Sequence, residues 1–363
     1  MAKLPDIRVR CDGQVLVGWE MADVYRDIES LNSTFSLALS TTPGVLPPIK
    51  RGSEVQILVG DTLVLTGHAD RPKLSYSREA CGHRITGRSR SGAMVKSSAM
   101  HKGGQWVNAK LERIVADLAK PFGVQVVVAP GVSTGAALAD FKLSFGESCK
   151  DAISRAARLR GLLVTTDEDG RVLLTKAGTG TAPAEIRRGG NVIRCEEIGD
   201  DQQQYQTYVG YAQSNVADDW DAARQVKAMA RDDEVEQYSV LVVQPDGNNT
   251  QADLQALVDH TARVRRGHAY GFRYTLEGWL ASGVPWPVNA RVKIYDDAAG
   301  LVGAEWLICA TRLAVDRKEG PVTVVDVRPI EAYDTVPLKT KLRHRKADRK
   351  GRGRDGARQG SER

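Results

Sequence analysis

Hydrophobic and polar residues alternate along the first 92 positions. In the segment Phe35-Ser36-Leu37-Ala38-Leu39 the large apolar side chains occupy every second position, and glycines and prolines separate this segment from the next. Alternation of period two places these side chains on one face of a strand. Short strands at such spacing predict an antiparallel barrel or sandwich. The pattern returns between residues 272 and 333, so the sequence predicts a mainly β protein.

The two β-rich blocks repeat the same order of strands. In the first, a strand beginning at Val55 is followed by a turn at Gly60 and a later turn at Gly82. In the second, a strand beginning at Val292 is followed by a later turn at Gly320, and the step from valine to turn glycine is 27 residues in the first block and 28 in the second. Such an internal echo predicts a duplicated structural unit. It aligns Leu63-Val64-Leu65 with Trp306-Leu307-Ile308.

The segment between residues 93 and 182 contains helical patterns. Leu111, Ile114, Val115 and Leu118 recur at the spacing of one helix face, and Asn108 precedes them as the predicted N-cap. These residues predict an amphipathic helix that packs its apolar face against a core.

A second helix and a hairpin follow in the same segment. Ser144 and Glu147 have the spacing of a capping box, and Gly161 is a suitable residue just after the helix end. Asp167-Glu168-Asp169-Gly170 lies between two apolar segments, which predicts a β-hairpin. We expect a compact α+β module here.

Residues 183–269 give a less regular pattern. Strands are predicted around Tyr208 and Leu241, and a helix over residues 250–266, which Gly267 is expected to end. We therefore predict a strand-and-helix module inserted into the second β block.

Composition narrows the class of protein. Apolar residues make up 42% of the chain and charged residues 26%, as in a soluble globular protein. No run approaches 18 apolar residues, and the N-terminus lacks the apolar segment of a secretory signal, so we expect synthesis in a cytoplasm and no membrane span. Five scattered cysteines predict reduced, mostly buried thiols.

The positive charge is concentrated at the C-terminus. Residues 337–363 contain 11 Lys and Arg and three acidic residues, whereas residues 1–336 contain 40 basic and 42 acidic residues. The first part is therefore near neutral and the tail strongly basic. Because the tail has few large apolar residues, we expect it to be disordered in isolation.

A set of short motifs, in a defined order, resembles the baseplate hub proteins of contractile-tailed phages of the Mu type. The motifs extend over most of residues 1–335. They include Gly18-Trp19, Thr66-Gly67-His68-Ala69-Asp70, Gly87-Arg88-Ser89, Gly146-Glu147-Ser148, Glu277-Gly278-Trp279, Trp286-Pro287-Val288-Asn289 and Glu331-Ala332-Tyr333.

The resemblance implies a structural protein without catalytic, cofactor-binding or metal-binding residues. Hubs of this family are homotrimers in which two related tube-like β domains per chain form a pseudo-six-fold ring. Expected partners are the tail tube or a tube initiator, the central spike, the tape-measure protein and baseplate wedge proteins. DNA would cross the lumen without specific binding, with no stable membrane insertion. The expected location is the baseplate of the virion tail, after assembly in the host cytoplasm.

The expected fold is mainly β with α+β inserts: two related tube-type β-barrel domains plus smaller α/β modules. We expect β domains to pair edge to edge between subunits, because exposed strand edges are templates for association. The predicted domains are residues 1–92 (first β domain), 93–182 (α+β module), 183–215 with 270–335 (second β domain), 216–269 (inserted module) and 336–363 (basic tail).

Several motifs admit a chemical interpretation, which we weigh against a structural one. Cys81, His83 and His101 lack the second ligand pair of a structural zinc site. The segment 167–170 lacks the Glu that a calcium loop needs at its twelfth position, where Gly178 stands. Ser89 lacks the second glycine of a nucleophile elbow, since Ser91 stands there. We expect structural roles for all of them.

Paired carboxylates and tryptophans are the remaining candidates within the folded part. Asp200-Asp201, Asp218-Asp219 and Asp232-Asp233 are expected to lie on the solvated surface, although a cell-wall hydrolase using two acidic residues stays the main alternative function. Trp279, Trp286 and Trp306 are expected in core and turn packing.

Basic residues are the candidate partner contacts. Arg88 and Arg90 are clustered near the end of the first block and could contact an acidic neighbour. The second alternative function is a nucleic-acid-binding protein acting through its basic tail. Without aromatic residues, tail binding to DNA would be nonspecific and salt-dependent. The tail candidates are Arg343, Arg345, Lys346, Arg349 and Lys350.

Overall fold

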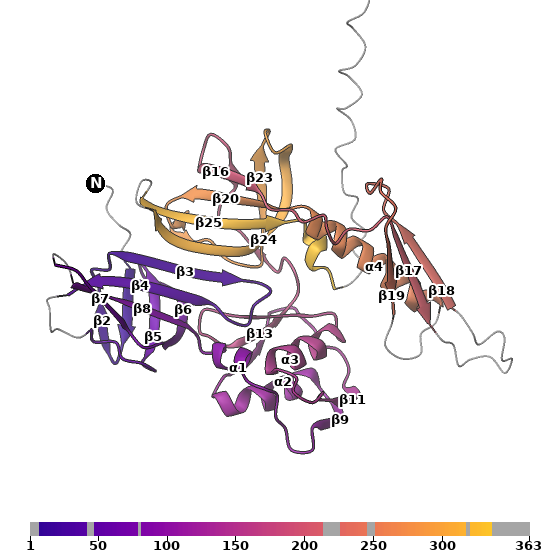
Figure 1. Ribbon diagram of the computed structural model, residues 1–363, viewed down its shortest axis with the longest axis horizontal. Helices are drawn as coiled ribbons and strands as arrows, with labels where there is room; N and C mark the ends of the chain where they lie inside the picture. Colours follow the sequence, from indigo (N-terminus) through magenta and orange to yellow (C-terminus); the bar gives the residue numbers. More distant parts are fainter. Residues whose placement is uncertain are drawn as a thin grey trace, which may run out of the picture.

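The computed structural model describes residues 7–41, 47–78, 81–212, 226–244, 251–316 and 320–335. It is mainly β with α-containing modules, which confirms the predicted fold class (Figure 1). Among these residues, no helix has the length and apolar character needed to cross a bilayer.

The first β block forms the N-terminal sheet. Its apolar face packs into one core around Phe35, Leu37, Ile57 and Ile85, each at most 3% exposed. The strands are β1 (Ile7–Cys11), β2 (Gln14–Leu16), β3 (Met21–Asp27), β4 (Thr34–Ser40), β5 (Glu54–Val59), β6 (Thr62–Ala69), β7 (Lys73–Tyr76) and β8 (Cys81–Ser89).

The second β block forms the C-terminal sheet around a separate core that includes Tyr274, Ile294 and Val325. A hairpin of β21 (Leu280–Ala281) and β22 (Val284–Pro285) and a short 3₁₀ helix, η2 (Ile330–Tyr333), accompany it. The strands are β14 (Gly180–Thr181), β15 (Ile186–Arg187), β16 (Val192–Glu197), β20 (Phe272–Glu277), β23 (Ala290–Asp296), β24 (Leu301–Asp316) and β25 (Gly320–Arg328).

The two sheets have the same topology. The N-terminal sheet runs β3-β4-β8-β6-β5-β1 and the C-terminal sheet runs β16-β20-β25-β24-β23, with β14 and β15 beside β23. In both, the strands take these places in the same order along the chain. A β-bulge follows Ile57 in β5 and Ile294 in β23. The predicted echo is therefore a structural repeat, although β1 is antiparallel to β5 whereas β14 and β15 are parallel to β23.

The long strand β24 joins the two sheets. Its first half pairs with β23, and its second half pairs with β3 of the N-terminal sheet from Ala310 opposite Asp27 to Ala314 opposite Asp23. The described strands of both blocks thus form one continuous 15-stranded sheet. Figure 1 shows β3 of one sheet lying beside β24 of the other.

The α/β module follows β8 and has a core of its own. The predicted helix face Leu111, Ile114, Val115 and Leu118 is buried there. The elements are α1 (Gly92–Lys96), β9 (Gln105–Ala109), α2 (Leu111–Ala119), η1 (Lys120–Phe122), β10 (Val126–Val128), β11 (Leu138–Lys142), α3 (Cys149–Arg158), β12 (Leu163–Thr166) and β13 (Val172–Thr175).

The two predicted helix starts in this module are wrong by a few residues. Asn108 lies in β9 with a positive φ, and Lys110 is the N-cap of α2. Ser148, not Ser144, caps α3 by accepting a hydrogen bond from the Asp151 backbone N–H at 3.1 Å. Glu147 keeps half of the expected capping box, because its Oε2 accepts from the Ser144 backbone N–H at 3.1 Å. The predicted hairpin around residues 167–170 is formed by β12 and β13.

The inserted module lies between β16 and β20. It comprises β17 (Thr207–Ala212), β18 (Val226–Arg231), β19 (Val240–Val243) and α4 (Gln251–Ala269). Leu254, Val258 and Ala262 of α4 are buried against Tyr208 and Ala228. Gly267 does not end the helix as predicted, since α4 continues for two further residues.

A polar groove across the joined sheets as the candidate functional site

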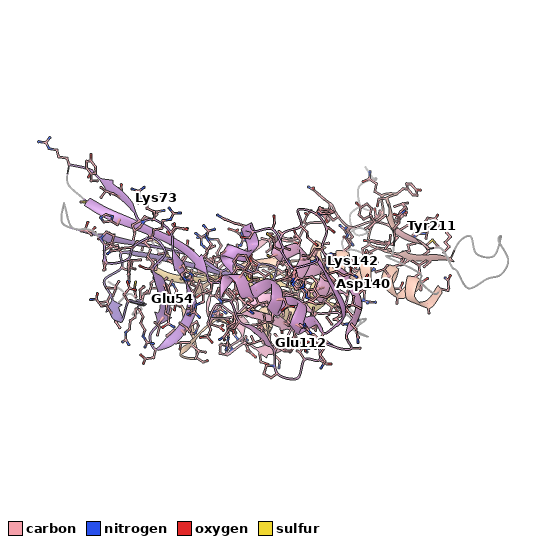
Figure 2. The ribbon with its side chains drawn as sticks, turned by 90° about the horizontal axis from the view of Figure 1, so that it is seen from below. Glu54, Lys73, Glu112, Asp140, Lys142 and Tyr211 are labelled. Atoms are coloured by element: carbon pink, nitrogen blue, oxygen red, sulfur yellow. The ribbon has the colours of Figure 1, made fainter. Side chains whose placement is uncertain are left out.

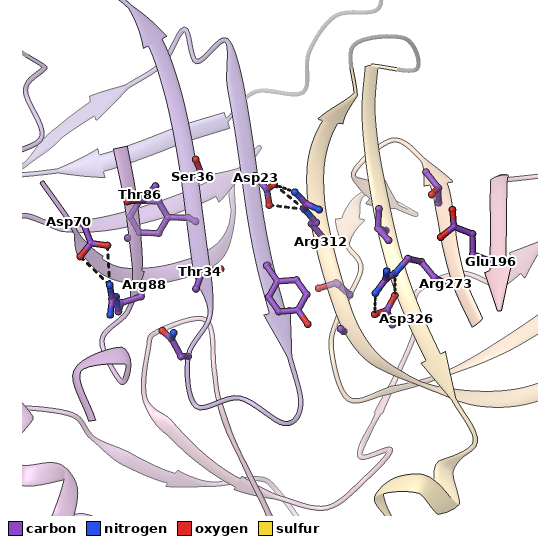
Figure 3. A pocket seen from close by; sticks show the side chains of 18 of the residues that line it. Asp23, Thr34, Ser36, Asp70, Thr86, Arg88, Glu196, Arg273, Arg312 and Asp326 are labelled. Carbon is purple, nitrogen blue, oxygen red and sulfur yellow. Dashed lines mark hydrogen bonds and ion pairs between the residues drawn. The ribbon is translucent and has the colours of Figure 1, made fainter. Parts of the chain in front are cut away.

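The face of the joined sheet that points away from both cores is polar and hollowed. A groove of about 790 Å³ crosses the junction between the two sheets, with walls from β3, β4 and β8 on one side and β20, β24 and β25 on the other. Figure 3 shows these side chains on both sides of the junction.

Strand alternation explains why this face is polar. In β4, Leu37 is buried in the N-terminal core while Thr34 and Ser36 line the groove. In β20, Tyr274 is buried in the C-terminal core, and the neighbouring Arg273 lines the groove. The period-two pattern in the sequence therefore determines the face of the groove as well as the core.

An ion pair spans the junction of the two sheets. Arg312 of β24 donates from Nε to Oδ1 and Oδ2 of Asp23 on β3 at 3.0 and 2.9 Å, and its Nη2 also contacts Oδ2. The hydrogen bonds to Asp23 raise the pKa of the Arg312 guanidinium. Because the guanidinium donates to both oxygens of one carboxylate, the orientation of the two groups is fixed. The ion pair thereby stabilises the backbone pairing of β3 with β24.

Two further ion pairs lie on this face, one on each sheet. Arg273 donates to both carboxylate oxygens of Asp326 at 2.7 and 2.8 Å, which raises the pKa of Arg273. Arg88 donates from Nη2 to both oxygens of Asp70 at 3.3 and 3.1 Å. Each of these arginines thus has its own carboxylate within the wall of the groove.

The charges that line the groove nearly cancel. Five cationic side chains and four anionic ones contribute to its lining. A surface with paired charges has no strong net attraction for a polyanion such as DNA. The charged lining residues are Arg88, Lys96, Arg194, Arg273, Arg312, Asp23, Asp70, Glu196 and Asp326.

The predicted partner residues of the first block occupy different places. Arg88 lines the groove, as described above. Arg90 lies between the N-terminal sheet and the α/β module, where it donates from Nε to Glu54 at 3.2 Å and from Nη1 to the Asp169 carbonyl at 3.3 Å. The tail residues Arg343, Arg345, Lys346, Arg349 and Lys350 lie outside the described residues.

The other chemical candidates have structural surroundings in the described part of the chain. No group of three or more His, Cys, Asp or Glu side chains there could hold a metal ion. Cys81 and His83 lie in β8, whereas the His101 ring stacks on Trp106 with a centroid distance of 4.1 Å. Trp279 and Trp286 are each 2% exposed, which confirms their expected place in core packing.

One expectation about the carboxylates is wrong. Asp232 is fully buried instead of solvated, because it accepts hydrogen bonds from Arg266 Nε at 3.0 Å and Gln204 Nε2 at 2.9 Å. Asp200 accepts from the Gln202 backbone N–H in a turn, and Asp218 and Asp219 lie outside the described residues.

The sequence alone did not reveal the groove. Asp23 and Arg312 are separated by 289 positions, and no local pattern connects them. The available signal was the duplication, since two copies of one sheet expose equivalent edges and can pair in a regular way.

Comparisons with known proteins agree with this architecture. The model of the Mu phage baseplate assembly protein GpP-like N-terminal domain matches residues 6–89, and the model of the second domain of the baseplate hub protein gp44-like family matches residues 91–176. The baseplate hub protein gp44 of Escherichia phage Mu is 29% identical over 349 residues, which is 94% of this chain and 92% of that protein.

Solved structures share the fold over nearly the whole chain. The 43 kDa tail protein of prophage MuSo2 from Shewanella oneidensis has a TM-score of 0.80 at 24% identity, covering 92% of this chain and 100% of that one. The tail protein from Neisseria meningitidis MC58 has a TM-score of 0.78 at 20% identity with the same coverage.

Fold and groove together define a mainly β protein built from two joined copies of one sheet. Both matched models describe phage baseplate proteins, and the similarity to gp44 extends over 94% of the chain, which confirms the resemblance found in the sequence. The similarity to a baseplate hub protein agrees with the expected location in the baseplate of the virion tail. The family is a structural one, and the absence of enzymatic activity stays a prediction.

Proposed function

We propose that three copies of this chain form the hub ring of the baseplate, which adapts the six-fold tail tube to the three-fold central spike. The observation that carries the proposal is the pairing of β3 with β24, which sets two sheets of the same topology side by side in one chain. Three such chains present six similar sheets around one axis. A ring of this kind can meet a six-fold partner on one side and a three-fold partner on the other.

The polar groove is the proposed wall of the central channel. Its charges are arranged as carboxylate–guanidinium pairs, so a passing DNA molecule or tape-measure protein finds no uncompensated cationic cluster in the lining. A lumen must let its cargo move, and near-neutral polar walls avoid tight electrostatic binding. This supports passage of DNA without specific recognition.

The remaining modules are proposed to contact the other baseplate proteins. The α/β module is fastened to the N-terminal sheet by Arg26 Nη2 on Glu168 at 2.7 Å and by Thr165 Oγ1 on the Asp27 carbonyl at 3.1 Å. Such attachment suits a brace that transmits load to the spike or to wedge proteins. The predicted domain limits remain part of this proposal.

The mass of the purified protein in solution tests the proposal. A mass of three chains is expected at working concentration, and a single-chain mass at all concentrations would contradict the ring. A peptidoglycan zymogram, run beside it, tests the alternative of a cell-wall hydrolase. No clearing is expected, whereas clearing that is lost on substitution of one carboxylate would support the hydrolase.

The basic tail supports a second candidate, nucleic-acid binding. Removal of residues 337–363 should leave the trimer intact under our proposal. If the protein acts mainly by binding nucleic acid, the same truncation should abolish retention of a DNA fragment at low salt, and the full-length protein should retain it.

A further inference from the structure

β7 and β16 are among the strands with an unpaired edge in the described part of the chain. β7 pairs with β8 alone, and β16 pairs with β20 alone. All four residues of β7 are exposed, as are five of the six residues of β16. Exposed edges of this kind are templates for pairing with another chain.

The internal repeat shows what each edge corresponds to. Val55 and Val292 stand at the same distance before the bulge, and they lie opposite Gly67 and Trp306, so Ala69 of β6 corresponds to Ile308 of β24. Ala69 lies opposite Gly87 and Ile308 lies opposite Val327, so Gly87 of β8 corresponds to Val327 of β25. In this alignment Arg84 matches Val324. The residues that lie opposite Arg84 and Val324 on the neighbouring strands therefore correspond to each other as well.

This match makes β7 the counterpart, in the N-terminal sheet, of the second half of β24. Lys73 lies opposite Arg84 and Arg312 lies opposite Val324, so Lys73 is the counterpart of Arg312. One residue further on, Leu74 is the counterpart of Leu313. Leu313 is 4% exposed where β3 covers the edge of β24, whereas Leu74 is 57% exposed.

In the same alignment, β16 of the C-terminal sheet is the counterpart of β3 in the N-terminal sheet. Phe35 lies opposite Gly87 and Phe272 opposite Val327, so the two phenylalanines correspond. Ser36, the next residue, then corresponds to Arg273. Asp23 lies opposite Ser36 and Glu196 lies opposite Arg273, so Glu196 is the counterpart of Asp23.

We propose that β16 of one copy pairs antiparallel with β7 of the next copy. Glu196 then forms an ion pair with Lys73 across this contact, as Asp23 does with Arg312 within the chain. This inference rests on the proposed ring and specifies its subunit contact. It repeats between chains the pairing of β3 with β24 that the chain already makes within itself. Each sheet of the ring then meets its neighbour through one type of contact.

The charges and apolar residues of the two edges support this partner. Glu196 and Lys73 are both exposed. Leu74, Tyr76 and Ile193 are 57%, 78% and 40% exposed, so pairing would cover apolar surface on both edges. Figure 2 shows Lys73 at the end of the molecule opposite Tyr211 of the inserted module, free of neighbouring modules.

The two edges are different surfaces of one chain, so the contact is head-to-tail. A head-to-tail contact generates a ring if its rotation closes and an open filament if it does not. The pairing of β3 with β24 is already one such contact, made between the two sheets of one chain. With two sheets in each chain, the six sheets of the proposed ring are supplied by three copies.

A disulfide can test the register. Continuing the register of β3 with β24 to the new edge places Tyr76 opposite Cys195, which is an exposed free thiol. Residues directly opposite in an antiparallel pair have Cβ atoms about 4.5–5.5 Å apart, close to the separation that a disulfide needs. Under mild oxidation, the Tyr76→Cys variant should therefore form a covalent trimer on a non-reducing gel.

Matched controls separate this contact from random oxidation. The double variant Tyr76→Cys with Cys195→Ser should lose the covalent trimer. Val17→Cys places a thiol at another exposed apolar position, directly after β2 and 64% exposed, and should give no crosslink with Cys195. A Val17→Cys trimer as abundant as that of Tyr76→Cys would overturn the assigned register.

Charge reversal gives a second test that needs no disulfide. Glu196→Lys or Lys73→Glu alone should reduce the fraction of trimer in solution by placing like charges at diagonal positions of the paired strands. The two substitutions together should restore it. Equal trimer fractions in all three variants would contradict the Glu196–Lys73 contact.

The outcomes distinguish this inference from the proposed ring. A trimeric mass without the Tyr76–Cys195 crosslink overturns the β16–β7 pairing and leaves the ring standing. A single-chain mass at every concentration overturns the ring and this pairing with it. Crosslinked trimers whose formation requires Cys195 support both.

Discussion

Glycines at the crossing of β6 and β8 let two backbones approach closely. A Cβ atom on Gly67 would lie 2.0 Å from the Arg88 carbonyl oxygen, and one on Gly87 would lie 2.3 Å from Cζ of Phe35. Both glycines belong to motifs that resemble the family, and their role is steric.

We predict that Gly67→Ala lowers the free energy of unfolding by about 3 kcal/mol, the upper end for overpacking, because the obstructing atom belongs to the backbone. Gly180→Ala is the control: its Cβ would meet its nearest neighbours at 3.6 Å, and the change should stay within about 0.5 kcal/mol. Denaturant unfolding of both variants measures the difference. Equal stabilities would contradict the close crossing.

His268 connects stability to pH. Burial lowers the pKa of its imidazole, with a smaller opposing effect of Glu29, while the nearby Arg328 and Arg265 also disfavour the charged form. Its ring meets Tyr333 edge-on at 5.3 Å. A histidine with a lowered folded pKa contributes stability above its unfolded pKa of about 6.5, and that contribution is lost as the pH falls through the folded value.

Acidification from pH 7.5 to 5.5 should therefore reduce the unfolding free energy of the wild type more than that of His268→Gln. The variant has no imidazole that must lose its proton on folding. His68→Gln, at an exposed position, serves as the control and should follow the wild-type curve. Parallel curves for wild type and His268→Gln would contradict the assignment.

Single residues also show where sequence reasoning fails. Gly267 was expected to end a helix, but a Cβ there would lie 2.5 Å from the Ala332 backbone nitrogen, so the glycine admits η2 against α4. Asp232 was expected at the surface but holds Arg266 inside the inserted module. The structural roles of Gly267 and Asp232 both depend on a partner residue that is distant in the sequence.

Elements with a strong local period were predictable. The apolar faces of α2 and α4 follow the helical repeat, and the β12–β13 hairpin follows its acidic turn. The alignment of the two β blocks was correct for Val55 with Val292 but not for the next strand. Gly67 lies opposite Val55 and Trp306 lies opposite Val292, so Trp306 is the counterpart of Gly67 instead of Leu63. Loop lengths between paired strands set this register, and composition does not record them.

At the level of elements, the helix α4 is held by few buried side chains. Leu254→Ala should lower the stability of the inserted module by about 2–5 kcal/mol, because Leu254 is fully buried against Tyr208. Ala256→Ser on the exposed side of the same helix should change it by less than about 0.5 kcal/mol. Hydrogen exchange of the α4 amides measures the local effect, and equal protection in both variants would contradict this packing.

The whole molecule is organised by one pairing that the sequence could suggest but not locate. The duplication indicated two similar sheets, and the resemblance implied a ring. Where the sheets join depends on the length of β24, which has 16 residues and continues past its pairing with β23 to pair with β3. Its alternating sequence gives no sign of the point at which the partner changes from β23 to β3, because both partners offer the same kind of edge.

Electron microscopy of the purified assembly viewed along its axis tests the central claim most directly. The account predicts a closed three-fold particle whose inner ring has six evenly spaced β lobes around an open channel. A particle with three lobes, or an assembly whose two sheets per chain lie at different radii, would contradict it.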